Sequence, residues 1–245
     1  MRVELMNIIH LLLDILFPTP CSYCRSPIGD SGIPHFCAEC CADFDSIAGP
    51  VCPRCGAPFD SPEALRASPD HLCSSCRRKL PLFDQALSVG YFEGPLREAI
   101  HQFKYRPCRS LGRPLGLWMA DRIRTLSAID MIMPVPLHAK RLRQRGFNQA
   151  LLLAYRMSVR HGITLIYDNL ARVRPTRPQV ELTGEERIEN VAGAFALRSP
   201  EKIENRHILL VDDVFTTGAT MNECAAVLKN SGASQVTACT LARAL

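Results

Sequence analysis

Two carboxylates and three threonine hydroxyls lie within one short stretch near the carboxyl end of the chain. Residues 207–220 read HILLVDDVFTTGAT, in which Asp212 and Asp213 directly follow an apolar run and Gly218 lies among the threonines. Carboxylates repel phosphate, so the aspartates are expected to hold sugar hydroxyls or Mg²⁺ instead. Glycine lets the backbone approach a ligand closely, and the hydroxyls add hydrogen-bond donors. The stretch therefore predicts a site for a phosphorylated ribose.

A strand and a helix must position these residues. Ile208–Val211 is short and rich in large apolar residues, which favours a buried strand. Apolar residues then recur at helical spacing over 221–228, and Asn230-Ser231-Gly232 is expected to end the helix. Open parallel sheets bind ligands where a strand's carboxyl end meets the next helix, whose free N–H groups attract anions. No Gly-Lys-Ser/Thr follows, so this is not a Walker loop.

The stretch resembles the 5-phosphoribosyl-1-pyrophosphate (PRPP) signature of type I phosphoribosyltransferases. Residue by residue, the resemblance places Asp212 and Asp213 on the ribose hydroxyls, directly or through Mg²⁺, as the catalytic pair. It implies an α/β fold whose mostly parallel sheet carries helices on both faces. It also places a loop around the 5′-phosphate, consisting of Thr216, Thr217, Gly218, Ala219 and Thr220.

A basic stretch follows a second predicted strand, Ile129–Val135. It places four positive charges within six residues, and three of them, Lys140, Arg141 and Arg145, are predicted to bind pyrophosphate. PRPP carries phosphate groups at both ends and needs two anion sites. Arginine suits the second site because its planar fork binds phosphate oxygens in pairs. A solvated basic loop is the alternative interpretation.

Residues 172–190 are rich in arginine and resemble the mobile lid that covers PRPP in such domains. A lid would exclude water from a reactive anomeric carbon, whereas a disordered basic loop is the alternative. The predicted lid residues are Arg174, Thr176, Gln179 and Arg187.

Cysteines indicate a separate amino-terminal module, because nine of the twelve precede residue 77. They form four Cys-x-x-Cys pairs, and two such pairs make a tetrahedral sulfur site that suits Zn²⁺. Gaps of twelve and seventeen residues fit two zinc ribbons with sequential pairing and two structural ions. Disulfides and an iron–sulfur cluster are alternatives, and Cys41 is interpreted as a spare cysteine. The predicted ligands are Cys21, Cys24, Cys37, Cys40, Cys52, Cys55, Cys73 and Cys76.

The chain is expected to divide near Leu80–Asp84. Residues 1–82 would hold an amino-terminal helix, Leu5–Leu16, and the double zinc ribbon, and residues 83–245 the phosphoribosyltransferase-like domain. The net charge of +5 permits polyanion partners. The basic run Arg77–Lys79 is interpreted as a solvated face, with a nucleic-acid contact as the alternative. No apolar run reaches the ~18–20 residues of a membrane span, and no signal peptide is recognised, so a cytoplasmic protein is expected.

The remaining regular elements are predicted from apolar periodicity. The expected strands are Ala86–Phe92 and Val236–Leu241, and the expected helices are Pro95–Phe103, Leu111–Leu126 and 146–160.

The order of these parts narrows the resemblance. PVPLHAKRLRQRGFNQA (134–150) stands downstream of the double ribbon and upstream of VDDVFTTGAT (211–220). This arrangement resembles the competence protein F family from Cys21 to Arg243. The resemblance implies a role in natural transformation, with PRPP and Mg²⁺ as ligands and incoming single-stranded DNA and DNA-uptake proteins as partners. A metabolic phosphoribosyltransferase for a small base or amine, and a non-catalytic binding protein, are the alternatives. The acceptor, the activity and the oligomeric state stay open.

Overall fold

The computed structural model describes residues 19–29, 32–61, 68–105, 108–123, 128–177 and 183–245. The predicted helix Leu5–Leu16 and the predicted lid residue Gln179 lie outside these ranges. Among the helices of the described ranges, none has the length and apolar character that crossing a membrane would require.

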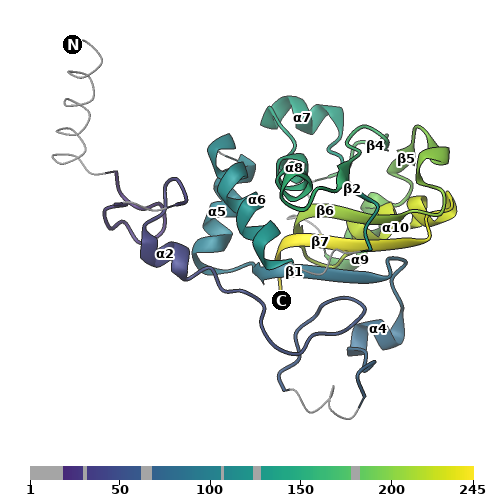
Figure 1. Ribbon diagram of the computed structural model, residues 1–245, viewed down its shortest axis with the longest axis horizontal. Helices are drawn as coiled ribbons and strands as arrows, with labels where there is room; N and C mark the ends of the chain where they lie inside the picture. The colour runs from purple at the N-terminus through teal and green to yellow at the C-terminus, as the bar shows by residue number, and fades with distance from the viewer. Residues whose placement is uncertain (1–18, 30–31, 62–67, 106–107, 124–127, 178–182) are drawn as a thin grey trace.

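Five parallel strands form the central sheet in the order β1-β7-β6-β2-β3 (Figure 1). Their bounds are β1 Gln85–Tyr91, β2 Met131–Pro134, β3 Thr164–Leu165, β6 His207–Phe215 and β7 Gln235–Arg243. The predicted strand Ile208–Val211 was too short, because β6 keeps pairing with β7 past the acids, with Asp212 opposite Thr240 and Phe215 opposite Arg243. The two aspartates therefore belong to the strand.

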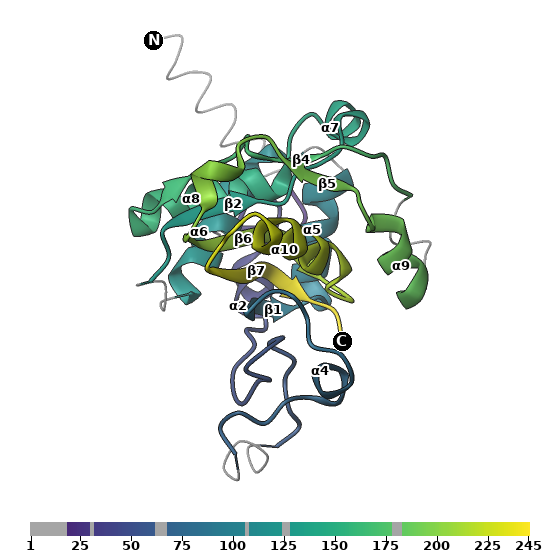
Figure 2. The ribbon, with the colours of Figure 1, turned by 90° about the vertical axis from the view of Figure 1, so that its right-hand side faces the viewer.

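Helices cover both faces of this sheet (Figures 1 and 2), as the resemblance implied. On one face α5 (Gly94–Tyr105), α6 (Gly112–Arg122) and α8 (Gln149–His161) share a core with Leu209 and Val211 of β6. On the other face α10, Ala219–Asn230, packs on Ile208 and Leu210. This alternation of sides along β6 is the period of a strand buried on both faces.

Two helices in the basic segments were not predicted. The basic stretch that we predicted to bind pyrophosphate forms helix α7, Ala139–Arg145. This helix is capped by Gly146, which has a φ of +75°. Helix α9, Gly184–Val191, begins inside the predicted lid and ends one residue beyond it, and Thr183 and Glu186 form a reciprocal capping box at its start. The predicted helix 146–160 begins only at Gln149 because Asn148 caps it.

Shorter elements complete the domain. An antiparallel pair, β4 Leu170–Arg172 with β5 Phe195–Leu197, lies between α8 and β6 in the sequence. The 3₁₀ turns are η1 Arg109–Leu111 and η3 Pro200–Ile203. The predicted helix Leu111–Leu126 starts in η1, so its α-helical part, α6, begins at Gly112; α6 ends at Arg122, and residues 124–127 lie outside the described ranges.

Each cysteine-rich ribbon contributes one short helix, α2 (Ala38–Ala42) or α4 (Ser74–Arg78), and both ribbons contact β1. After the first ribbon, the Ile47 N–H donates to the Val89 carbonyl at 2.8 Å. In the second ribbon the Arg54 carbonyl accepts from the Ala86 N–H at 2.9 Å. Figure 1 shows α2 beside α5 and α4 beyond β1. The domain boundary at residues 82/83 stays a prediction.

Leu153→Ala is expected to destabilise the protein by ~2–5 kcal/mol. Leu153 is fully buried on α8 where this helix packs against Gly116 of α6, so the substitution leaves a cavity. Urea unfolding measures the loss. Val159→Ala on the same helix is the control, because Val159 is 62% exposed and should cost about 0.5 kcal/mol or less. Equal losses in both variants would contradict the packing described.

Candidate functional site

The predicted phosphate loop connects β6 to α10. Gly218 caps α10 with φ +75°, and a Cβ added there would lie 2.6 Å from the Phe215 ring. Both the backbone conformation and the space therefore require glycine at this position. Thr217 is exposed, and its Oγ1 accepts a hydrogen bond from the Ala219 N–H at 3.4 Å. The sequence gives the loop a sharp turn whose threonine hydroxyls surround the start of a helix.

The acid pair lies at the carboxyl end of β6 with a lysine from another element. Lys104, in the last turn of α5, places its Nζ 2.7 Å from Asp213 Oδ1. Asp212 Oδ1 accepts from the Asp213 N–H at 2.8 Å. Lys104 was missed as a site residue, because no local pattern connects it to acids so far along the chain. The pair thus has a built-in counter-charge.

The two carboxyl groups differ in environment. Burial, and then the neighbouring Asp213, raise the pKa of Asp212 to about 7. Lys104 and Arg172 oppose this shift without overcoming it. Near neutral pH the Asp212 carboxyl can therefore exist in either form, and a bound cation would favour the carboxylate. A side chain in this state can accept a hydrogen bond from a sugar hydroxyl or hold a metal ion.

These groups open onto one cavity of about 380 Å³ at the carboxyl edge of the sheet. Of the predicted pyrophosphate residues, Arg141 and Arg145 line it, whereas Lys140 is exposed and does not. Of the predicted lid residues, Arg187 lines it. The polar lining consists of Lys104, Tyr105, Arg141, Gln144, Arg145, Arg172, Arg187, Asp212, Asp213, Thr216 and Thr220.

The other two described lid residues, Thr176 and Arg174, form hydrogen bonds with residues beside this cavity. The Thr176 carbonyl accepts from Arg141 at 3.2 Å, and its hydroxyl accepts from Arg172. Arg174 donates to the carbonyls of Asn190 and Ala192, at 3.2 and 2.6 Å, which ties the segment before α9 to the end of that helix. Both residues therefore hold the basic segment in place.

Arg172 is the first residue of the predicted lid segment, although it was not among the lid residues selected for the site. It lies on β4 over the Phe195 ring at 5.2 Å, and its Nε has no hydrogen-bond partner among the described residues. Burial, and then nearby Arg141, lower its pKa. Arg172 also lines a second cavity, of about 540 Å³, that shares Leu137 with the first. A cation in this position favours an anion in either cavity.

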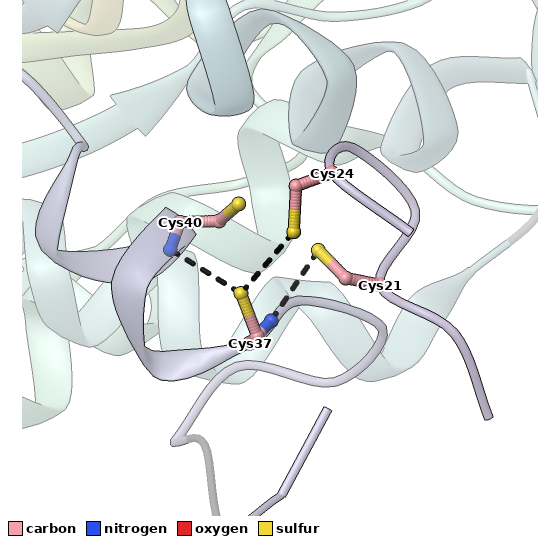
Figure 3. A group of neighbouring side chains, drawn as sticks. All are labelled: Cys21, Cys24, Cys37 and Cys40. Carbon is pink, nitrogen blue, oxygen red and sulfur yellow. Dashed lines mark hydrogen bonds between the residues drawn. The ribbon is translucent and has the colours of Figure 1, made fainter. Parts of the chain in front are cut away.

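The eight predicted metal ligands form two tetrads with the sequential pairing that was predicted. In each tetrad the four sulfur atoms lie within 4.8 Å of one another. Figure 3 shows the first, in which Cys21, Cys24, Cys37 and Cys40 point toward one another. Cys41 lies outside it, and its Sγ is 3.9 Å from the Phe36 carbonyl. The second tetrad joins Cys52, Cys55, Cys73 and Cys76.

The donor chemistry of both tetrads fits Zn²⁺. Burial alone would raise the pKa of Cys21 and Cys52, but backbone N–H groups overcome it and lower these pKa values to about 6 and about 7. For Cys40 and Cys76, burial and the neighbouring cysteines raise the pKa. Each tetrad thus contains at least one thiol whose surroundings favour ionisation and one whose surroundings oppose it, and a divalent cation would stabilise the thiolates together.

Comparison with known proteins agrees with this arrangement. Residues 12–77 match the double zinc ribbon domain, and residues 145–245 match the phosphoribosyl transferase domain. DNA utilization protein YhgH of Salmonella typhimurium is 33% identical over 93% of this chain and 98% of its own length. Competence protein F of Haemophilus influenzae is 33% identical over 91% of this chain and 96% of its own. The chain belongs to the competence protein F family.

A relative with lower sequence identity also matches most of the chain. Competence protein ComFC of Bacillus subtilis is 28% identical over 84% of this chain and 83% of its own length. These relatives and domain matches confirm the resemblance to the competence protein F family that the sequence showed. They also confirm the α/β fold and the double zinc ribbon that precedes it in the chain.

Cys40→Ser is expected to leave one bound zinc per chain instead of two, because it removes a thiolate from the first tetrad. Elemental analysis of the purified protein measures this ratio. Cys41→Ser is the control, since the neighbouring thiol lies outside the tetrad. Loss of an ion in Cys41→Ser, or retention of both in Cys40→Ser, would refute the assignment.

Asp212→Asn is expected to stabilise the protein at high pH, since ionisation of this carboxyl opposes folding. The pKa of Asp212 is about 7 in the fold and ~3.9 in an unfolded chain. The penalty is absent below about pH 4 and grows as the pH rises toward 7. Without Mg²⁺, the variant should gain on the order of 1–4 kcal/mol over wild type at about pH 8 and little at about pH 4.

Urea unfolding across this pH range measures the difference. The amide introduced by Asp212→Asn keeps an oxygen that can accept from the Asp213 N–H, so the substitution removes charge rather than the hydrogen bond. Asp121→Asn is the control, because the side chain of Asp121 is 49% exposed. Parallel pH profiles for wild type and Asp212→Asn would contradict the raised pKa of Asp212.

Proposed function

We propose that this protein binds PRPP with Mg²⁺ in the cavity at the carboxyl edge of the sheet. We also propose that it acts in DNA uptake, handling incoming single-stranded DNA in the cytoplasm. The observation that carries the first part is the convergence of the acid pair, Thr216, Thr220 and the arginines on one cavity. The names of the relatives, competence protein F and DNA utilization protein, support the second part.

Each part of PRPP has a complementary group in the cavity. The 5′-phosphate would lie in the loop Thr216–Thr220, where donors and a helix N-terminus favour an anion. Asp212 and Asp213 would hold the ribose hydroxyls or Mg²⁺. Arg141 and Arg145 would bind the pyrophosphate, with Arg172 beside them and Lys140 at the outer end.

The same residues could support transfer of the phosphoribosyl group. The bond from ribose C1 to pyrophosphate would break with both electrons leaving on the pyrophosphate, and the acceptor would then bond to C1 and lose a proton. Arg141 and Arg145 would stabilise the charge that develops on the leaving group. Mg²⁺, when bound, supplies further positive charge there. Asp212 and Asp213 would fix the ribose, and Arg174, Thr176, Gln179 and Arg187 belong to the proposed lid, which would exclude water.

Basic groups outside the cavity support a polyanion partner. Lys140 and Arg143 on α7 are exposed, and so are Arg77 and Arg78 in the last turn of α4. Exposed cations attract the phosphates of a single strand, and such binding weakens steeply as salt concentration rises. The proposed polyanion is an incoming single strand, and α7, whose Arg141 and Arg145 line the PRPP cavity, would bring it close to that cavity.

Calorimetric titration tests the PRPP site. Wild-type protein with both zinc ions should bind PRPP in the presence of Mg²⁺. The Asp212→Asn/Asp213→Asn double variant should bind at least ~10-fold more weakly, because each charge-assisted contact contributes about 1.5–3 kcal/mol. Thr217→Val should weaken binding less, because it removes one hydroxyl from the loop.

Asp121→Asn should leave the affinity unchanged, since Asp121 lies on the surface in an ion pair with Arg160. Equal affinity in wild type and the double variant would exclude this cavity as the PRPP site. If wild-type protein binds PRPP, an assay of pyrophosphate release separates the two roles. Release on adding single-stranded DNA would support the DNA-handling role, and release on adding a small base or amine would support a metabolic phosphoribosyltransferase.

A further inference from the structure

A buried arginine joins the second cysteine tetrad to the sheet. Arg243, the last residue of β7, is 8% exposed. Its Nη1 donates to the Cys55 carbonyl at 2.7 Å, and its Nη2 lies 3.8 Å from Cys55 Sγ. Among the described residues no carboxylate pairs with this guanidinium. Four thiolates around Zn²⁺ would carry a net negative charge, so the metal-loaded tetrad would serve as the counter-ion of Arg243.

The same guanidinium also reaches the phosphate loop. Its central carbon lies 4.4 Å over the ring of Phe215, the last residue of β6. That ring in turn fills the space beside Gly218, where an added Cβ would approach it to 2.6 Å. A continuous series of contacts therefore runs from Cys55 through Arg243 and Phe215 to the residue that turns the loop.

We propose that Arg243 is a positioning residue that makes the conformation of the loop Thr216–Thr220 depend on metal in the second tetrad. With metal bound, the knuckle that contains Cys55 is fixed, and Arg243 holds Phe215 under Gly218. Without metal the knuckle loses its fold, the guanidinium loses its acceptor, and the loop opens more often. The idea rests on the proposed function only for the identity of the loop's ligand.

The first tetrad provides an internal comparison. It packs on the opposite core, where Phe44 lies edge-on against Trp118 at 5.7 Å. There Arg122 stacks over Trp118, also at 4.4 Å, and donates to Ser46 at 2.8 Å. This contact has the same chemistry as that of Arg243, but no described contact continues from it to the phosphate loop.

Hydrogen exchange of the full chain with both zinc ions tests the proposal without any ligand. Arg243→Met should increase amide exchange over residues 216–220 at least ~10-fold relative to wild type, while elemental analysis still shows two ions. Arg122→Met should leave exchange in that loop unchanged. Wild-type exchange in a two-zinc Arg243→Met protein, or equal increases in both variants, would overturn the proposal.

Stepwise chelation of wild-type protein gives the result even if Arg243→Met does not fold. Alkylation of freed thiols identifies which tetrad has opened at each step. Protection of 216–220 should fall together with the opening of Cys52, Cys55, Cys73 and Cys76, and should be indifferent to the first tetrad. A loop that stays protected after the second tetrad has opened would refute the coupling. Absence of PRPP binding would count against the proposed function alone.

Discussion

Two adjacent carboxyl groups at the carboxyl end of β6 are the constraint on which the site depends. Burial and repulsion by Asp213 disfavour ionisation of Asp212, whose pKa is raised to about 7. Positive groups from separate elements offset this negative charge, namely Lys104 of α5, Arg141 of α7 and Arg172 of β4. Since these elements are distant in the sequence, the charges are balanced only in the complete fold. Because positive side chains outnumber the carboxylates around this cavity, the site suits a negatively charged ligand such as one that carries phosphate groups.

The parallel sheet explains how those elements meet. Strand β6 lies between β7 and β2, so its carboxyl end is flanked by the ends of both neighbours. Connections between parallel strands must cross a face of the sheet, which places α8 on one face and α10 on the other. The loops that begin these crossovers all open at one edge. The acids, the phosphate loop and α7 gather there because of topology rather than because of their spacing in the chain.

The sequence was sufficient wherever the chemistry is local. The acids and threonines of 212–220 stand in one stretch, and the Cys-x-x-Cys pairs have spacings that few other structures require. Lys104 escaped prediction because only tertiary contacts bring it to the cavity. Arg172 falls within the predicted lid segment but was not among the lid residues selected for the site. Helix α9 was missed although Thr183 and Glu186 match a capping box, because its eight residues include only two large apolar side chains, Ile188 and Val191, too few for a clear helical repeat. The end of β6 was misjudged because pairing with β7 outweighs the low strand preference of aspartate.

The ribbons also cover the unpaired edge of the sheet. Strand β1 is an edge strand, paired with β7 on one side only, and an open edge is a template for unwanted pairing. Segments next to the two tetrads occupy that edge: the Ala86 N–H donates to Arg54, the Val89 carbonyl accepts from Ile47, and the Tyr91 N–H donates to Asp45. Neither ribbon has enough apolar residues for a core of its own, so metal must hold these segments in shape. Metal that folds the ribbons therefore protects the open edge of β1.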